Sequence, residues 1–545
     1  MRKYLIAFSP FIIFTLFFTA ITYFYYQRIG SFGCFDDCFN YMGGYFLLKG
    51  KVIYSEFFYN HQPLMAYFSY FIQKISSPSS IYQLILYHRL FIYLFSFLMG
   101  IILIFRFKWN ALAFLLVFES TKFYLFGDRF LAEGFIIYPF VYLFGITWLK
   151  IGKKAIKTYD YILSGIFAWF VIFMREPFIP VGVLLYLLII FNKSSTFFPW
   201  SIKLTEKNEE RHSRNKLRGF KEVLDKNEVK PKVLSFFIFG ILTAGTLFLF
   251  PIQDYILNLF TFNQKGTGSE ISSHGGVLAN IITALFYPIY VFITGEKSIF
   301  RYVLIVTSIM FLDVLLNLFK RKEFKQILLI ILVLGLSNIR FTAPGTMYFQ
   351  AFHMLIWYGL FIFAIFLCIS EWIRKEKKFW IIMLPVFLIT IYSLLSKDSF
   401  LKKTDKMLEF NNSYANEYAY GTGIKLLSKS TDTLFLEGTH DLIYWVADLN
   451  TSYKYGWYTS IMPYIDKYSS QRTAMFIKNS PDFYYDACKL LKQNNLKPTV
   501  KEINRQYLRL LINSKPSCLL IKKDKIKTIS DERWNSVKPL GFSLK

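Results

Sequence analysis

The sequence predicts an α-helical multi-pass membrane protein of about 11 transmembrane helices, followed by a small soluble α/β domain. Hydrophobic residues make up 54% of the 545 residues, and aromatic residues make up 20%. Apolar runs repeatedly approach the ~20 residues that a helix needs to cross a ~30 Å hydrocarbon core. After about residue 396 no run of that length remains, and Lys, Asp, Asn and Ser become frequent.

The first apolar run, residues 4–26, follows Met1-Arg2-Lys3. It is longer than the core of a typical signal peptide, and no clean small-residue cleavage site follows, so we expect a retained anchor. The other expected spans are 81–105, 110–126, 132–149, 159–174, 177–191, 233–252, 299–319, 325–342, 346–370 and 378–396. Residues 277–294 are also apolar enough to span, but we expect a re-entrant or interfacial helix there.

The net charge of +27 indicates orientation in a membrane. Much of the Lys and Arg falls in short loops that would share one side, as the positive-inside rule predicts for the cytoplasm. The excess charge therefore favours a lipid bilayer and argues against a nucleic acid as partner. We expect a plasma (inner) membrane protein with a cytoplasmic N-terminus and an extracytoplasmic C-terminal domain.

The predicted domains are a membrane bundle, residues 1–396, and a soluble domain, residues 397–545. Within the bundle, 27–80 is the first outer loop, and the charged loop 192–232 reads as a flexible cytoplasmic linker. In the soluble domain, 432–438 and 517–521 are typical of short buried strands. Ser480-Pro481-Asp482 predicts the start of a helix that runs to Leu491.

The cysteines leave two options open. Cys34 and Cys38 in the first outer loop, and Cys488 and Cys518 in the tail, would face an oxidising space and can form disulfides. Metal ligation by Cys34 and Cys38 with the neighbouring carboxylates lacks a His at a recognisable zinc spacing.

Ionisable residues gather at the outer ends of the expected spans, where charge is costly and marks function by default. Asp36 and Asp37 are adjacent, and neighbouring carboxylates need a compensating cation, metal or reacting hydroxyl. The plainer interpretation of that pair is a solvated loop with a helix N-cap. The other ionisable candidate residues are His61, Glu133, Arg175 and Arg340.

Each candidate side chain suits a chemical role. Arg175 and Arg340 can clamp a phosphate, because guanidinium groups match phosphate oxygens at two points. Alternatively, Arg175 pairs with Glu176 or extends to lipid headgroups. Asp36 can act as a general base towards a hydroxyl. His61 can equally be an ordinary hydrogen-bonded surface residue.

The first outer loop resembles that of the GT-C glycosyltransferases that use polyprenyl-phosphate sugars, the superfamily of protein O-mannosyltransferases and lipid A aminoarabinose transferases. The resemblance is carried by the order and spacing of Asp36-Asp37, Gly50, Tyr54, Phe57-Phe58 and His61-Gln62-Pro63-Leu64. Shorter matches lie at Leu131-Ala132-Glu133-Gly134-Phe135, at Phe173-Met174-Arg175-Glu176-Pro177, and at Arg340 with Tyr348 and Gln350. Asp37 departs from the usual Glu, Gln62 from a Pro or Lys, and Met347 stands where a His is common.

The resemblance implies a glycosyltransferase of GT-C-like fold that moves a sugar from a polyprenyl-phosphate donor to a hydroxyl of a glycan, lipid or protein acceptor. It implies catalytic roles for Asp36, Asp37 and Glu133. Substrate binding would fall to His61, Arg175, Arg340, Tyr348 and Gln350. No cofactor is certain, and a divalent cation at Asp36 and Asp37 is an option.

Two other classes stay open. An O-antigen ligase or polymerase-like enzyme also joins lipid-linked sugars, but it predicts a long late outer loop rich in Arg and His. A non-catalytic transporter or flippase predicts Gly/Pro-broken spans, mid-membrane ionisable residues and often two similar halves.

Overall fold

The computed structural model describes most of the chain. The described residues are 2–30, 33–34, 36–191, 214–265, 299–338, 351–376, 384, 386–392, 405–438, 440–488 and 497–544. The α-helices among them are α1 (Arg2–Arg28), α2 (Asp36–Leu48), α3 (Leu64–Ser76), α4 (Ile81–Phe107), α5 (Trp109–Thr121), α6 (Ala132–Ile151), α7 (Thr158–Met174), α8 (Ile179–Phe191), α9 (Arg214–Leu247), α10 (Ile252–Ile256), α13 (Ile299–Lys320), α14 (Phe324–Leu336), α16 (Leu355–Glu376), α18 (Lys406–Ser413), α19 (Ala415–Leu427), α20 (Leu442–Ala447), α21 (Asp466–Lys478), α22 (Lys497–Gln506), α23 (Lys523–Ile526) and α24 (Asp531–Val537). The short helical turns are η1 (Lys122–Leu125), η2 (Glu176–Phe178), η3 (Leu257–Thr261), η4 (Ala351–Met354), η5 (Met462–Tyr464) and η8 (Lys538–Leu540). The strands are β1 (Thr433–Glu437), β2 (Asn450–Thr451), β3 (Trp457–Tyr458), β4 (Phe483–Tyr485), β5 (Tyr507–Ile512), β6 (Lys515–Lys522) and β7 (Phe542–Ser543).

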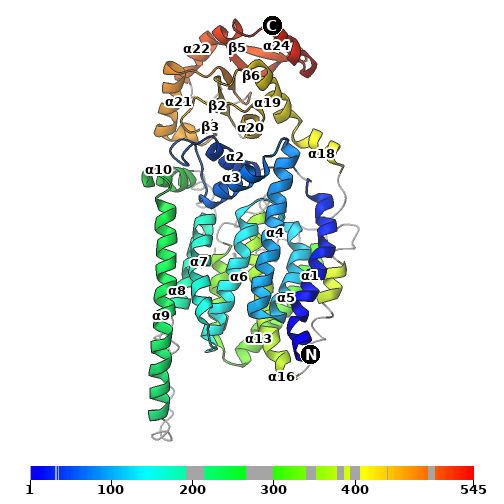
Figure 1. The fold of residues 1–545 in the computed structure, drawn as a ribbon, viewed down its shortest axis with the longest axis vertical. Helices are drawn as coiled ribbons and strands as arrows, with labels where there is room; N and C mark the ends of the chain where they lie inside the picture. The colour runs from blue at the N-terminus through cyan, green and yellow to red at the C-terminus, as the bar shows by residue number, and fades with distance from the viewer. Residues whose placement is uncertain are drawn as a thin grey trace. The chain divides into compact units, whose positions relative to one another are not determined.

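The chain forms two compact units. Unit 1 comprises residues 1–26, 92–246 and 274–402, and unit 2 comprises residues 27–91, 247–273 and 403–545. Unit 1 is helical: α6 packs against α7, α8 and α16, and α5 packs against α16. These helices run side by side in the bundle of Figure 1.

Six helices within the described residues are long and apolar enough to cross a membrane. They are Phe8–Gln27, Ile81–Phe107, Ala132–Ile151, Val229–Leu247, Phe300–Lys320 and Phe352–Ile369. The chain is therefore a largely helical protein with the features of a multi-pass membrane protein. The spans expected at 159–174, 177–191 and 325–342 correspond to shorter apolar helices. The span expected at 110–126 is the 13-residue α5 followed by η1.

Some expectations fall outside the described residues. These are the segment 277–294 and most of the expected span 378–396. The charged loop 192–232 is described only from residue 214, and there the linker interpretation is wrong. Residues 214–232 form the first part of the 34-residue helix α9. The stretch is rich in Lys, Arg, Glu and Leu, which have high helix propensity, and it runs directly into an apolar span.

Within the described residues, unit 2 contains a mixed sheet in the order β2-β1-β4-β6-β5-β7, and β3 also pairs with β1. Strand β1 runs parallel to β2, β3 and β4, and β4 runs antiparallel to β6. Four of the five β1 residues are buried, as expected for a strand with neighbours on both sides. The predicted strands at 432–438 and 517–521 are confirmed as β1 and β6.

The helix predicted from Ser480 is wrong where it can be compared with the structure. Phe483–Tyr485 is strand β4, which pairs Tyr484 with Phe435 of β1 on one side and with Leu520 of β6 on the other. Three consecutive aromatic residues favour a strand, and the two neighbouring strands supply its ladder. Asp482 does not cap a helix here. Its carboxylate accepts a hydrogen bond from the Thr433 amide at 2.9 Å, which ties the start of β4 to the start of β1.

Unit 2 has one hydrophobic core built from three distant parts of the sequence. Residues 27–91 contribute Phe46, residues 247–273 contribute Phe262, and residues 403–545 contribute Trp457. The Phe46 and Trp457 rings stack with centroids 5.4 Å apart. The Phe58 amide donates a hydrogen bond to the Tyr455 carbonyl at 2.8 Å. The segment 27–91 and the C-terminal residues 403–545 are thus parts of one folded body.

Two glycines allow α2 to lie close to α3. A Cβ on Gly44 would come within 2.6 Å of the Ser69 and Tyr70 backbone, and a Cβ on Gly43 within 2.9 Å of the Ala66 side chain. No real Cβ atom approaches backbone that closely, so the helix pair excludes larger residues at Gly44. This packing fixes the helix that begins with the acidic pair.

Candidate functional site

Asp37 lies in the second position of α2 and is fully buried. Its Oδ2 accepts a hydrogen bond from the Tyr41 hydroxyl at 3.1 Å and from Nη2 of Arg89 at 3.2 Å. Arg89 is also buried, and its Nη1 donates to the Ile29 carbonyl at 2.6 Å. Burial, and next the Asp37 charge, raise the pKa of Tyr41 well above its usual value, so its hydroxyl keeps the proton that it donates. Asp37 is therefore held within a buried ion pair.

Asp36 precedes Asp37 and differs from it in two ways. Its side chain is half-buried, and it makes no hydrogen bond or ion pair with any residue that the structure describes. It is the first residue of α2, where the partial positive charge of the helix N-terminus favours a carboxylate. The Cys34–Cys38 disulfide spans both acidic residues. Of the adjacent pair, Asp36 is the carboxylate that is not committed to a partner in the described chain.

His61 is buried among aromatic rings. Its ring meets Phe39 edge-on at a centroid distance of 5.4 Å and Tyr59 at 6.0 Å. Its carbonyl accepts a hydrogen bond from the buried Tyr54 hydroxyl at 2.8 Å. The next residue, Gln62, donates from Nε2 to the Tyr255 hydroxyl at 3.0 Å. His61 therefore is not an ordinary surface histidine, and its turn is fixed on both sides.

Glu133 and Arg175 lie together in unit 1, both buried. Nε of Arg175 is 3.1 Å from Oε1 of Glu133. Nδ1 of His353 also lies 3.1 Å from that Oε1. Glu176 is farther away, with its Oε1 3.9 Å from Nη1 of Arg175. Glu133 is therefore the closer partner, which disfavours the simple pairing of Arg175 with its sequence neighbour.

The backbone explains the position of Arg175. Helix α7 ends at Met174, and the extended Arg175 follows it as the C-cap residue. Pro177 cannot continue a helix with a backbone hydrogen bond, so a short turn, η2, separates α7 from α8. Glu133 lies in the first turn of α6. The structure thus brings together two of the predicted site residues from two helix ends.

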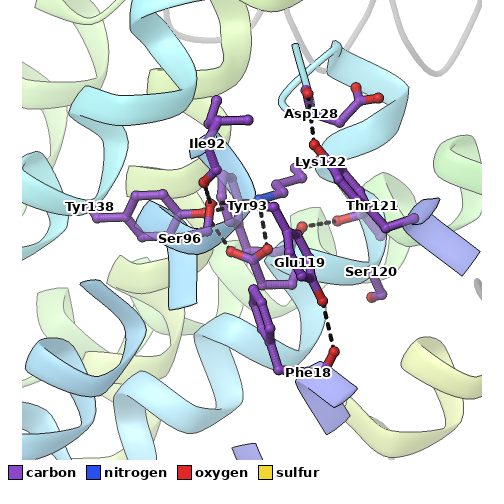
Figure 2. A network of polar contacts seen from close by, with 12 residues as sticks. Phe18, Ile92, Tyr93, Ser96, Glu119, Ser120, Thr121, Lys122, Asp128 and Tyr138 are labelled. Carbon is purple, nitrogen blue, oxygen red and sulfur yellow. Dashed lines mark hydrogen bonds and ion pairs between the residues drawn. The ribbon is translucent and has the colours of Figure 1, made fainter. Parts of the chain in front are cut away.

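Unit 1 contains a second buried charge network, shown in Figure 2. Nζ of Lys122 lies 2.7 Å from Oε2 of Glu119 and donates to Oγ of Ser96 at 3.0 Å. The Tyr138 hydroxyl donates to Oε1 of Glu119. The network joins α4, α5, η1 and α6. Buried charges persist only when paired and hydrogen-bonded, and this pair meets both conditions.

Four of these side chains, Arg89, Glu119, Lys122 and His353, were not among the sequence candidates. The signal for them was present: each lies inside or beside an apolar run, where an ionisable residue calls for a partner. Three predicted site residues, Arg340, Tyr348 and Gln350, lie outside the described residues.

The described residues give little support for a metal site. Asp486, Cys488 and Cys518 are the one His/Cys/Asp/Glu group there that is tight enough to hold an ion. Both cysteines of that group are joined in a disulfide, so they offer no thiolate. At the acidic pair, Arg89 already compensates Asp37, which leaves Asp36 as the one carboxylate to face a cation. We assign no metal to either place.

Comparison of the chain with protein-family models, with curated proteins and with solved structures finds no match.

Proposed function

We propose that the protein is an integral membrane glycosyltransferase that moves a sugar from a polyprenyl-phosphate donor to an acceptor hydroxyl on the outer face of the membrane. The observation that carries the proposal is the unequal acidic pair: Asp37 is buried against Arg89, whereas Asp36 is half-buried without a partner in the described chain. The backbone at Asp36 is fixed because Asp37 is bonded to Arg89, and the Asp36 carboxylate is bonded to no described residue. Such a carboxylate suits a general base.

In the proposed reaction, Asp36 accepts the proton of the acceptor hydroxyl while that oxygen forms a bond to the anomeric carbon of the sugar. The bond between the anomeric carbon and the phosphate oxygen breaks, and the polyprenyl phosphate leaves with the electron pair. The reaction inverts the anomeric configuration, because the acceptor attacks opposite the leaving group. Asp37 keeps the start of α2 in place.

The leaving phosphate gains negative charge, so it needs fixed positive charge near it. We assign that task to Arg175 and Arg340, with Tyr348 and Gln350 as further donor-binding residues. Glu133 orients Arg175, as the 3.1 Å contact between them supports. His61, which packs edge-on against the Phe39 ring, contributes to the shape of the site.

The proposed orientation follows from the charge distribution. The basic short loops face the cytoplasm, so the N-terminus is cytoplasmic and the C-terminal domain extracytoplasmic. The shared core of the first outer loop and the C-terminal domain is consistent with both lying on one side. A nucleotide sugar, which is a cytoplasmic metabolite, is then a poor direct donor.

The proposal is tested with purified protein in liposomes and a panel of radiolabelled polyprenyl-phosphate sugars. Wild type is compared with Asp36→Asn, which keeps the shape of the side chain but removes its basicity. Glu56→Gln is the matched control: it is an exposed carboxylate of the same loop, and its Oε2 accepts a hydrogen bond from the Val52 amide.

We expect wild type and Glu56→Gln to release the labelled sugar from its polyprenyl phosphate, either to an acceptor hydroxyl or to water, and a loss of at least 100-fold in Asp36→Asn, the lower range for removal of a general base. Activity of Asp36→Asn equal to wild type would overturn the assignment of the base. If wild type transfers no sugar from any donor yet binds lipid-linked sugar, the proposal fails in favour of a ligase or flippase.

A further inference from the structure

The helical segment after the span Val229–Leu247 has an apolar side that the protein does not cover. Helix α10 and the wide turn η3 run without a break over residues 252–261. Ile252, Ile256 and Phe260, at spacings of four residues, are 45%, 47% and 49% exposed. Exposed side chains at helical spacing form a continuous apolar stripe along this segment. We call these three residues the α10 stripe.

The opposite side of the segment is bound to unit 2. Asn258 and Leu259 are buried, and Nδ2 of Asn258 donates to the Tyr54 carbonyl at 3.1 Å. The Tyr255 ring meets the Tyr54 ring edge-on at 5.2 Å. The segment is therefore docked firmly, and the exposure of the α10 stripe does not come from a loose helix.

Polar contacts also hold the segment at its flanks. Nζ of Lys467 lies 2.9 Å from Oδ1 of Asp254. Nδ2 of Asn263 donates to the Asn60 carbonyl at 3.0 Å. Because these bonds fix the rotation of the helix about its axis, the side that carries the α10 stripe is set by the fold.

The chain itself indicates what covers the stripe. The candidate span ends at Leu247, and α10 begins at Ile252. Five residues of fully extended chain reach at most about 18 Å, so α10 begins close to the membrane boundary. The link between them is also apolar and open, with Phe248 89% exposed. A helix at that depth with one exposed apolar side, and with its other side docked on the protein, suits an interfacial position.

We infer that residues 252–261 form an in-plane helix whose α10 stripe enters the headgroup and upper acyl region of the bilayer. The occupant of the stripe is lipid, because the segment continues directly from a membrane span. The same helix bonds to Tyr54 and Gln62, and Asn263 just after it bonds to Asn60, all in the stretch that carries His61. Lipid contact at the stripe therefore sets that stretch at the level of lipid headgroups. The inference does not depend on the transferase proposal.

Site-directed spin labelling in liposomes tests the inference. The five cysteines of the chain are two disulfide pairs and one buried free Cys368, so a Cys368→Ala background leaves no free thiol. Single variants Ile256→Cys and Phe260→Cys place a nitroxide on the stripe. Ser470→Cys, at an exposed position of α21 in the same unit, is the control in water. Power saturation then measures collisions with oxygen, which concentrates in hydrocarbon, and with a water-soluble nickel chelate.

We expect the ratio of oxygen to nickel collisions to be several-fold higher at positions 256 and 260 than at position 470. A ratio at the stripe equal to that at position 470 would place the stripe in water and overturn the inference. Low collision rates with both reagents, with an immobilised spectrum, would mean that protein covers the stripe, and would overturn it equally. Folding of each labelled variant is checked by its elution as a single species in detergent.

Discussion

Nη2 of Arg89 lies 3.2 Å from Oδ2 of Asp37, and both side chains are almost completely buried. A guanidinium from α4 thus neutralises the second carboxylate of the acidic pair. Because neither charge reaches water, removing one partner leaves the other uncompensated.

We therefore expect Arg89→Met to lower the free energy of unfolding by about 3–5 kcal/mol, the range for breaking a buried pair. Thermal unfolding in detergent, followed by tryptophan fluorescence, measures the loss. The double variant Arg89→Met/Asp37→Leu removes both charges and should recover most of it. If the double variant is as unstable as the sum of the single ones, the two residues are not coupled.

The network of Figure 2 gives a second test in unit 1. Lys122→Met leaves the buried Glu119 carboxylate without its ion-pair partner. We expect the free energy of unfolding to fall by about 3–5 kcal/mol. Adding Glu119→Gln should restore part of that loss, since the charge is then gone. Chemical unfolding of the four species gives the coupling energy of the pair. A coupling near zero would contradict the ion pair.

Asp441 should make the stability of unit 2 depend on pH. Burial, opposed in part by His440, raises its pKa to about 7, and Glu417 and Asp36 add to the rise. A carboxyl group with a raised folded pKa binds more protons folded than unfolded, so stability falls as pH rises from about 4 to 7. We expect Asp441→Asn to remove the decrease in stability that Asp441 causes between about pH 4 and pH 7. The variant protein should therefore unfold at a higher temperature than wild type at pH 8.

At pH 4, where Asp441 is protonated in wild type, the stabilising effect of Asp441→Asn should disappear. Asp448→Asn is the matched control, because Asp448 ends the same helix but is exposed and pairs with Lys49 at 2.7 Å. Its effect on the melting temperature should not follow the same pH course. A stabilisation by Asp441→Asn that is equal at pH 4 and pH 8 would contradict the raised pKa.

The Cys488–Cys518 disulfide closes a sequence separation of 30 residues next to the β4–β6 pairing. Loop-closure entropy for that length corresponds to about 3–4 kcal/mol. We expect Cys488→Ala/Cys518→Ala to lower the stability of the C-terminal domain by that amount, as measured by urea unfolding. Reducing agent should destabilise wild type more than the double variant, in which only the Cys34–Cys38 disulfide remains to be reduced. Equal sensitivity of both proteins would assign the effect to Cys34–Cys38 and contradict a stabilising role for Cys488–Cys518.

The sequence was informative where structure depends on local, one-dimensional pattern. Apolar length predicted the spans beginning near Ile81 and Ala132, and the run Asp432–Gly438 predicted β1. It failed where a neighbour far along the chain decides the outcome. Phe483–Tyr485 forms a strand because it pairs with β1 and β6. The residues around position 483 carry no signal that identifies these two distant partners.

The same reason separates the predicted site from the observed one. Adjacent carboxylates were visible at Asp36 and Asp37, but their unequal burial depends on Arg89, 52 residues away. The sequence predicts Glu133 and Arg175 as site residues, yet His353, the third member of their cluster, lies 220 residues from Glu133. Spacing in the sequence indicates which residue types are present, whereas partnership depends on the tertiary fold.

The shared core of unit 2 also has a consequence for biosynthesis. The Tyr45 hydroxyl donates to Oδ1 of Asp448, a contact between residues 403 positions apart. At about 5–20 residues per second, the ribosome finishes the second partner roughly 20–80 s after the first. During that interval Phe46 and Phe57 have no Trp457 or Tyr455 to cover them. Phe46 and Phe57 are therefore among the first residues made and among the last to be covered, and a chain truncated before Tyr455 would present an aromatic surface to chaperones and proteases.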